Sequence, residues 1–298
     1  MNASVHLLRK VVPATVHLRA EIADSHPSAE ILGNERAGTG TVVAPWGLIV
    51  TAHYLLIGSK TIEVTLDDGE TQIGDVVGID YASGLGVVKL KEQARTGVVI
   101  RSIDDVQAGE EVFLVASVDD GRRVDAGAVS SIDAFEAFWE YLLDRAITVT
   151  VQNPGLGGGP LLDSLGRMIG VVALSLAEVG KFTLAVPASL VNPVLDEVVR
   201  SGRYRAASPR AWIGITCYAL RDHVVLAGVV PDSPAAHAGL EPGDVVLAID
   251  GHEVHDRRAL YEHIWRRATG DPIRLLVFRT NERRAVEIVA GNIETFFS

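Results

Sequence analysis

The sequence has one cysteine, few aromatic residues and no long apolar run. Cys217 has no second cysteine to pair with, so it cannot form an intramolecular disulfide. Cysteine content therefore does not indicate whether the protein works in an oxidising or a reducing compartment. Aromatic residues make up only 6% of the 298 positions. No stretch reaches the roughly 18 uninterrupted apolar residues that a membrane-spanning helix needs. In residues 1–20, Lys10, Pro13 and Arg19 interrupt the apolar residues, so there is no continuous apolar stretch of the kind that a signal peptide needs. The expected location is therefore, by default, cytoplasmic.

Basic residues are also scarce. The 27 Lys and Arg residues stand against 38 Asp and Glu residues, which gives a formal net charge of -11. Binding to nucleic acid or to an anionic membrane needs a dense basic surface, so neither partner is expected. The nine histidines show no spacing typical of a metal site, and no cofactor motif is present. We therefore expect neither a metal nor a cofactor.

Glycine, in contrast, is plentiful, and its 29 residues separate short β-type runs in the first two thirds of the chain. The expected strands include residues 61–66, 98–103, 111–115, 147–151 and 168–174. Helical patterning is confined to residues 135–143 and 189–200. This texture predicts an all-β domain over residues 1–200.

After residue 200 the pattern changes. Residues 201–210 are rich in Arg, Ser and Ala and contain Pro209, which predicts an exposed linker. Residues 211–292 then form a compact α+β module. Its expected strands are residues 213–218, 224–230, 244–249, 273–278 and 284–289, and its expected helices are residues 233–238 and 257–268.

Two motifs make the first domain resemble the trypsin-like protease domain of the HtrA family. Residues 38–43 (GTGTVV) are followed by residues 47–53 (GLIVTAH), which match the segment that presents the family's catalytic histidine. Residues 153–161 (NPGLGGGPL) match its nucleophile loop, Asn-Pro-Gly-Asn-Ser-Gly-Gly-Pro-Leu. The resemblance implies a double β-barrel of the chymotrypsin type.

The positions that carry the chemistry depart from the family pattern. Acyl transfer of this kind needs a hydroxyl nucleophile, a histidine base and a carboxylate that orients the histidine. The resemblance makes His53 the base, but it places Gly157 at the nucleophile and Gly84 at the acid. Asp80 lies four residues before Gly84, too far to take over its role. The resemblance leaves Gly155 and Gly157 as the remnant of an oxyanion loop.

The second domain resembles an HtrA-type PDZ domain over residues 227–251. Ser233 can cap a short helix, and Gly239 can end it. Upstream, Ile213, Gly214 and Ile215 look like the loop of such domains that receives a peptide's terminal carboxylate on consecutive backbone N–H groups. The resemblance therefore implies peptide binding through these three residues.

We expect a mainly β protein in which a chymotrypsin-like double barrel is followed by a PDZ domain. Its expected function is that of a pseudoprotease that binds polypeptides, above all C-terminal tails, as a regulatory, adaptor or chaperone-like protein. The resemblance also implies an active relative or a homo-oligomer, such as a trimer, as partners. Two alternatives stay open. One is a serine endopeptidase with a non-standard nucleophile, although the candidates Ser164, in a probable turn, and Ser175, on the next strand, lack the glycine-framed geometry of a nucleophile, and Cys217 in the second domain is no better. The other is a structural scaffold whose PDZ groove is closed.

Overall fold

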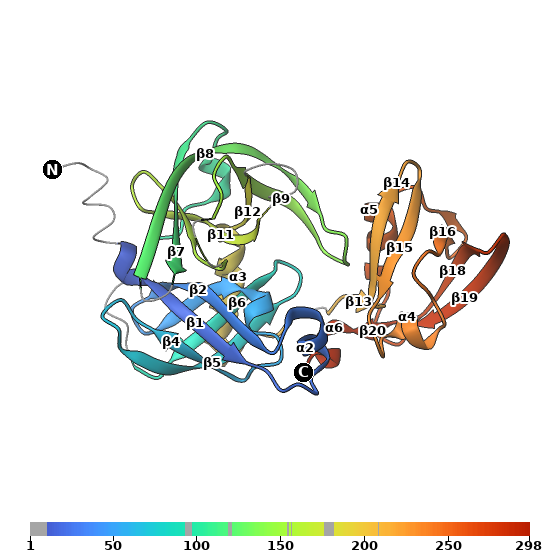
Figure 1. The fold of residues 1–298 in the computed structure, drawn as a ribbon, viewed down its shortest axis with the longest axis horizontal. Helices are drawn as coiled ribbons and strands as arrows, with labels where there is room; N and C mark the ends of the chain where they lie inside the picture. Colours follow the sequence, from blue (N-terminus) through green and yellow to red (C-terminus); the bar gives the residue numbers. More distant parts are fainter. Residues whose placement is uncertain are drawn as a thin grey trace. The chain divides into compact units, whose positions relative to one another are not determined.

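The computed structural model describes residues 11–92, 97–118, 121–153, 155, 157–175, 182–207 and 209–298. These residues divide into two compact units (Figure 1). Unit 1 contains the residues up to Ala134 together with Asp144–Arg205. Unit 2 contains Ala206–Ser298 and also Phe135–Leu143, a segment from the middle of the first domain's sequence.

The first half of unit 1 is a closed six-stranded barrel with the strand order β1-β2-β3-β6-β5-β4. Along β1 the apolar side chains Val16, Leu18 and Ala20 alternate with more exposed residues, which is the pattern of a strand with one face in a core. The strands are β1 (Thr15–Glu21), β2 (Glu35–Ala44), β3 (Leu48–Ala52), β4 (Thr61–Thr65), β5 (Thr71–Asp80) and β6 (Leu85–Leu90).

The second half of unit 1 is another closed barrel, with the order β10-β11-β12-β9-β8-β7. Its core contains the fully buried side chains of Leu114, Ile147 and Leu161. The strands are β7 (Glu111–Val118), β8 (Gly121–Glu136), β9 (Leu142–Val149), β10 (Pro160–Asp163), β11 (Met168–Ser175) and β12 (Thr183–Pro187).

Short helices connect and follow these strands. The helix α3 buries Val191, Val194 and Val198 on one face and ends at Gly202, whose φ of 79° is the left-handed conformation that glycine adopts readily. The helices of this unit are η1 (Val12–Ala14), α2 (Pro27–Leu32), η2 (His53–Leu55), η3 (Ile103–Asp105), η4 (Ala188–Leu190) and α3 (Val191–Ser201).

Unit 2 is built on a sheet with the order β14-β15-β16-β18-β19, so that β14 is an edge strand. The helix α5 packs Leu260, Tyr261 and Ile264 into the core of this unit, and all three are fully buried. Its strands are β13 (Ala211–Trp212), β14 (Ile215–Leu220), β15 (His223–Val229), β16 (Val245–Ile249), β17 (His252–Glu253), β18 (Pro272–Arg279), β19 (Glu282–Val289) and β20 (Gly291–Asn292). Its helices are α4 (Pro234–His237), α5 (Arg257–Trp265) and α6 (Ile293–Phe296).

The structure confirms the predicted fold class, a mainly β chain with two barrels and an α+β module. It differs from the expected elements in two places. Residues 98–103 form only an isolated bridge at Ile100 and the start of η3, not a strand. The aromatic stretch Phe135–Leu143 is not helical either: β8 ends at Glu136 and β9 begins at Leu142. The N–H of Ala137 donates to the carbonyl of Tyr141 at 3.0 Å, which closes the segment as a hairpin tip.

Candidate functional site

His53 follows directly on β3 and begins η2. Its backbone N–H donates to the carbonyl of Gly84 at 2.9 Å. Its ring lies edge-on to Tyr81, with the centroids 5.7 Å apart. Gly84 has a φ of 79°, which an aspartate adopts only with strain. Gly84, which the resemblance places at the acid position, thus presents its carbonyl to the backbone N–H of His53.

The environment of His53 weakens it as a base. Burial lowers the pKa of His53 to about 4, and this effect outweighs the opposite effects of the Gly84 carbonyl and the charge of Asp80. A general base for work near neutral pH performs best with a pKa near 7. The imidazole is therefore neutral at pH 7 and holds a proton less readily than a free histidine.

A proton titration of the His53 ring by NMR is expected to show a midpoint near pH 4. Because the unfolded chain takes up this proton at a higher pH than the folded chain, stability should fall as the pH falls from about 6.5 toward 4. A His53→Gln variant assigns the resonance and should lose this part of the pH dependence. A midpoint at or above 6.5 would contradict the burial of this side chain.

The carboxylate of Asp80 takes part in a turn. Its carboxylate accepts hydrogen bonds from the Ser83 hydroxyl at 2.5 Å, from the Ala82 N–H at 3.1 Å and from the Ser83 N–H at 3.3 Å. These bonds are typical of an aspartate that closes a turn. The turn leads from β5 into β6 and places Gly84 beside His53.

The space at Gly157, which the resemblance predicts to be the nucleophile position, is taken by another side chain. A Cβ atom built on Gly157 would lie 2.5 Å from the hydroxyl oxygen of Tyr54. Burial raises the pKa of Tyr54, so that this hydroxyl keeps its proton at neutral pH. A serine at position 157 would need Tyr54 to turn away.

The nucleophile loop is anchored on its C-terminal side. The carbonyl of Gly157 accepts from the Thr39 N–H at 2.8 Å, and Gly158 donates to the carbonyl of Val172 at 2.7 Å. At the other end, the side-chain amide of Asn153 donates to the carbonyl of Gly155 at 2.8 Å. Gly155 and Gly157, the predicted remnant of the oxyanion loop, therefore each accept a hydrogen bond at the backbone carbonyl. Residues 154 and 156 of the motif lie outside the described residues.

The other candidate nucleophiles lie elsewhere. Ser164 is an exposed residue in the turn between β10 and β11, and Ser175 is exposed at the end of β11. Cys217 is fully buried in β14, and burial raises the pKa of its thiol to about 12.

Sequence reasoning missed the residue that holds η2 in place. Arg36 is only 5% exposed, and its guanidinium donates to the carbonyls of Tyr54 at 2.9 Å and Ile57 at 2.7 Å. It also donates to the carbonyl and the hydroxyl of Ser28. Arg36 thus fixes the backbone that carries His53 and Tyr54. The sequence pattern gives no signal for this role, because the partners are backbone atoms distant along the chain.

In unit 2, the predicted carboxylate loop presents its N–H groups in one direction. The carbonyl of Ile213 accepts from the Ala235 N–H at 2.8 Å, and the carbonyl of Gly214 accepts from the Val230 N–H at 2.8 Å. Gly214 has a φ of 86°, and a Cβ there would lie 2.3 Å from the Cβ of Ser233. With its carbonyls held on this side, the loop turns the N–H groups of Ile213, Gly214 and Ile215 to the opposite side.

These N–H groups converge on the carboxylate of Glu140. Its Oε1 accepts from Gly214 at 2.7 Å, from Ile215 at 3.1 Å and from Ile213 at 3.3 Å. Burial raises the pKa of Glu140 to about 7, although the three backbone hydrogen bonds act in the opposite direction. The three predicted residues thus come together around a carboxylate group, one that belongs to the chain itself. Because residues 135–143 were predicted to be helical, the sequence did not indicate Glu140 as a ligand of this loop.

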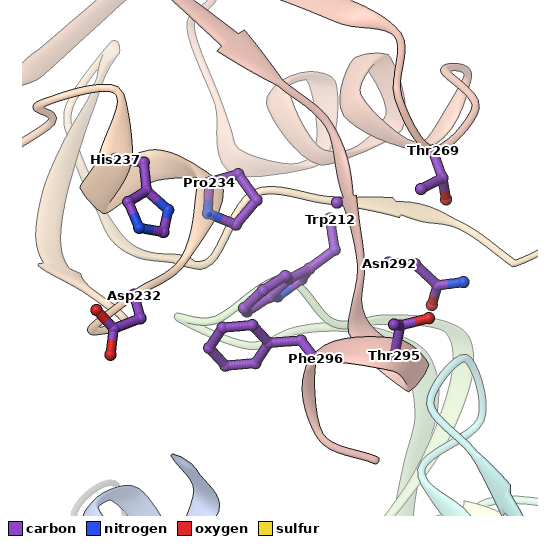
Figure 2. Close-up of a pocket in the computed structure, with 9 residues that line it drawn as sticks. Trp212, Asp232, Pro234, His237, Thr269, Asn292, Thr295 and Phe296 are labelled. Atoms are coloured by element: carbon purple, nitrogen blue, oxygen red, sulfur yellow. The ribbon is translucent and has the colours of Figure 1, made fainter.

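A separate hollow of about 300 Å³ lies elsewhere on unit 2 (Figure 2). Trp212 and Phe296 form its apolar wall, with ring centroids 4.7 Å apart, and Asp232 and His237 lie at its side. Ile213, Gly214 and Ile215 do not line it. It is therefore distinct from the carboxylate loop.

Within the ranges that the structure covers, no three His, Cys, Asp or Glu side chains are grouped as metal ligands. In the same described part of the chain, no helix has both the length and the hydrophobicity to cross a membrane.

Comparison with known proteins gives two family matches. Residues 38–171 match the trypsin-like peptidase domain, and residues 211–289 match the PDZ domain. A probable periplasmic serine endoprotease DegP-like from Halomonas elongata is 27% identical over 286 residues, which cover 89% of this chain and 59% of the relative. Its counterpart from Chlamydia pneumoniae is 30% identical over 233 residues, 73% of this chain and 47% of the relative. The chain thus spans about half the length of the curated relatives it matches.

Solved structures agree on the fold. The HtrA-type protease AlgW with a decapeptide has a TM-score of 0.59 at 22% identity, and the match covers 98% of this chain and 99% of that one. The serine endoprotease from Yersinia pestis has a TM-score of 0.58 at 22% identity and covers 98% of both chains.

The names of the relatives contradict the cytoplasmic location expected by default, because they are called periplasmic. That expectation rested on hydrophobicity at the start of the chain alone, which is no test of where a protein functions. The two domain matches show that the chain has a trypsin-like peptidase domain followed by a PDZ domain, and its fold is that of HtrA-type proteases.

Proposed function

We propose that this chain is an HtrA-like pseudoprotease that binds polypeptides, holding C-terminal tails at its PDZ domain, and acts as a regulatory, adaptor or chaperone-like protein. One observation carries the binding half of the proposal. The N–H groups of Ile213, Gly214 and Ile215 already donate hydrogen bonds to a carboxylate, that of Glu140, with N–Oε1 distances of 2.7 to 3.3 Å. A peptide's terminal carboxylate has the same chemistry and needs the same donors.

Three features of the barrel support the absence of cleavage. Gly157 offers no hydroxyl, and the hydroxyl of Tyr54 takes the space where a side chain would begin. His53, with a pKa near 4, is a weak base at neutral pH. The raised pKa of Tyr54 disfavours the phenolate that would be needed if this residue attacked instead.

A closed-groove scaffold is the second candidate function, and the position of Glu140 favours it. In that case the carboxylate loop would serve only to hold the chain's own segment. We also propose two protein partners besides peptides. One is an active HtrA-type relative, and the other is further copies of this chain, for example in a trimer. The peptide-bound AlgW structures support the binding of peptides by the shared architecture.

The test of the catalytic half uses purified protein with a fluorophosphonate probe and with casein. We expect no labelled serine and no digestion, while an active HtrA-type protease gives both under the same conditions. Labelling that a Ser164→Ala or Ser175→Ala substitution removes would overturn the proposal in favour of an endopeptidase with a non-standard nucleophile.

The binding half is tested with decapeptides whose last four positions are randomised, with either a free or an amidated C-terminus. Free peptides should bind, and amidated peptides should not. Gly214→Ala should abolish binding, because its Cβ would meet Ser233. Gly251→Ala is the matched control: it has a φ of 84° as well, but no atom lies within 4 Å of the added Cβ. If free and amidated peptides both fail to bind, the scaffold function is favoured instead.

A further inference from the structure

The hairpin tip joins the edge of the PDZ sheet as a peptide ligand would. Trp139 forms an antiparallel bridge with Thr216 of β14, and the N–H of Cys217 donates to the carbonyl of Phe138 at 2.5 Å. Going from Phe138 to Glu140, the segment therefore runs from Cys217 toward Gly214. This is the direction in which a bound tail runs toward the carboxylate loop when it adds a strand to a sheet edge.

The carboxylate at the end of this short strand comes from a side chain. The backbone continues past Glu140 into β9, so no chain terminus is available there. The side chain of Glu140 instead places its Oε1 2.7 Å from the N of Gly214. A glutamate in mid-chain thus supplies the group that a partner would supply from its C-terminus.

Contacts on both sides of Glu140 hold the tip in the groove. The hydroxyl of Tyr261 in α5 donates to the carbonyl of Phe138 at 3.1 Å. The guanidinium of Arg258 donates to the carboxylate of Glu136 at 3.0 Å. On the other side, Leu142 is 7% exposed and belongs to the hydrophobic core of unit 2. The tip therefore engages the sheet edge, the helix and the core together.

The tip leaves part of the edge uncovered. Its pairing with β14 reaches Thr216 and Cys217, whereas Tyr218 and Leu220 farther along the strand are 61% and 66% exposed. Phe138 of the tip is itself 48% exposed. The ring of Phe138 lies 6.4 Å from that of Tyr218 and so covers it only in part. A longer extended peptide can pair along all six residues of β14 and bury more of Tyr218 and Leu220 than the tip does.

We propose that residues 136–142 are an intramolecular ligand of the PDZ groove, held at the carboxylate loop by Glu140, and that a partner's tail binds by displacing them. The second half of this inference rests on the proposed function. The displacing tail has a free terminal carboxylate, an extended stretch with apolar side chains for the exposed part of β14, and an acidic residue upstream that replaces Glu136 at Arg258.

The first test needs no peptide. Hydrogen exchange of the amides of Gly214, Ile215 and Cys217 should speed up by about 10- to 100-fold in Glu140→Ala, because charge-assisted hydrogen bonds that hold the segment are lost. Glu140→Gln keeps the shape and should lie between this variant and the wild type. Asp133→Ala, an exposed acidic residue on the same hairpin, is the matched control and should leave exchange unchanged.

The second test supplies the segment in trans. An amidated decapeptide with the sequence of residues 131–140 should bind Glu140→Ala at least about tenfold more tightly than the wild type, whose groove is filled. The same peptide with Gln in place of its terminal Glu should bind Glu140→Ala at least about tenfold more weakly. Both affinities are measured by fluorescence anisotropy at pH 8, where a carboxyl with a pKa of about 7 is ionised.

The outcomes separate this inference from the proposed function. Unchanged exchange in Glu140→Ala, or equal affinity of the decapeptide for the wild type and the variant, overturns the inference and leaves tail binding untouched. Faster exchange together with tighter decapeptide binding supports the intramolecular ligand. If free-tail peptides then bind neither protein, the proposed function and the displacement by tails fall, and the segment is the permanent occupant of a closed groove.

Discussion

A Gly158→Ala variant is expected to lose about 3–5 kcal/mol of stability in unit 1, the sum of left-handed backbone strain and overpacking. Gly158 has a φ of 91°, and the added Cβ would lie 2.2 Å from the hydroxyl of Thr51 and 2.3 Å from the carbonyl oxygen of Thr39. Those two atoms are themselves joined by a hydrogen bond of 2.7 Å. The backbone must therefore shift at the point where the nucleophile loop meets the first barrel.

The matched control for this variant is Gly69→Ala in the turn between β4 and β5. Gly69 has a φ of 85°, but no atom lies within 4 Å of its added Cβ, so it isolates the backbone strain from the clash. Its expected cost is about 1–2 kcal/mol. Urea unfolding followed by hydrogen exchange of β3 and β10 reports on unit 1 by itself. Equal losses in the two variants would show that the loop adapts to the extra methyl group.

An Arg36→Met variant is expected to destabilise unit 1 by about 3–5 kcal/mol, because four carbonyls, those of Ser28 and Ile57 in buried contacts, would lose the guanidinium as a donor. These carbonyls are those of Ser28, Gly33, Tyr54 and Ile57. Methionine has a similar length and fills the space, so the loss reports on the polar contacts more than on packing.

The control for Arg36 is Arg19→Met on β1, whose side chain is 49% exposed and forms an ion pair with the exposed Glu21. Its expected effect is within about 0.5 kcal/mol. A loss of the same small size in Arg36→Met would mean that water replaces the guanidinium at these carbonyls. In that case η2 would not depend on Arg36 for its position.

The fold was predictable because its signals are local in the sequence. The glycine-framed segments around His53 and Gly157, and the Ser233–Gly239 helix signal, each specify backbone geometry within a few residues. The structure confirms the mainly β architecture that they predict, whereas the assignment of Gly157 and Gly84 to the nucleophile and acid positions stays a prediction from the resemblance.

The occupants of the two sites were not predictable in this way. Tyr54 meets Gly157 from about one hundred positions away in the chain, and Glu140 meets Gly214 across 74 positions. Neither contact leaves a periodic pattern, since each depends on how distant segments pack. The aromatic residues of the tip led to a wrong prediction of a helix. Over so few residues, the spacing of aromatic side chains that pack on a sheet edge cannot be told from the spacing of those on one face of a helix.

The location was wrong for a different reason. The expectation of a cytoplasmic protein was a default drawn from hydrophobicity alone, and it was not supported by any chemical feature of the chain. The relatives named periplasmic overturn it.

Unit 2 is assembled from two stretches that the ribosome makes at different times. Phe135–Leu143 leaves the ribosome well before Ala206–Ser298 has been translated. Until the later stretch has folded, the aromatic side chains of the early one have no groove to enter and remain open to contact with other nascent chains. Unit 2 is therefore completed well after Phe135–Leu143 has been made, and termination of translation within residues 206–298 would leave the aromatic hairpin tip without the sheet that it packs on.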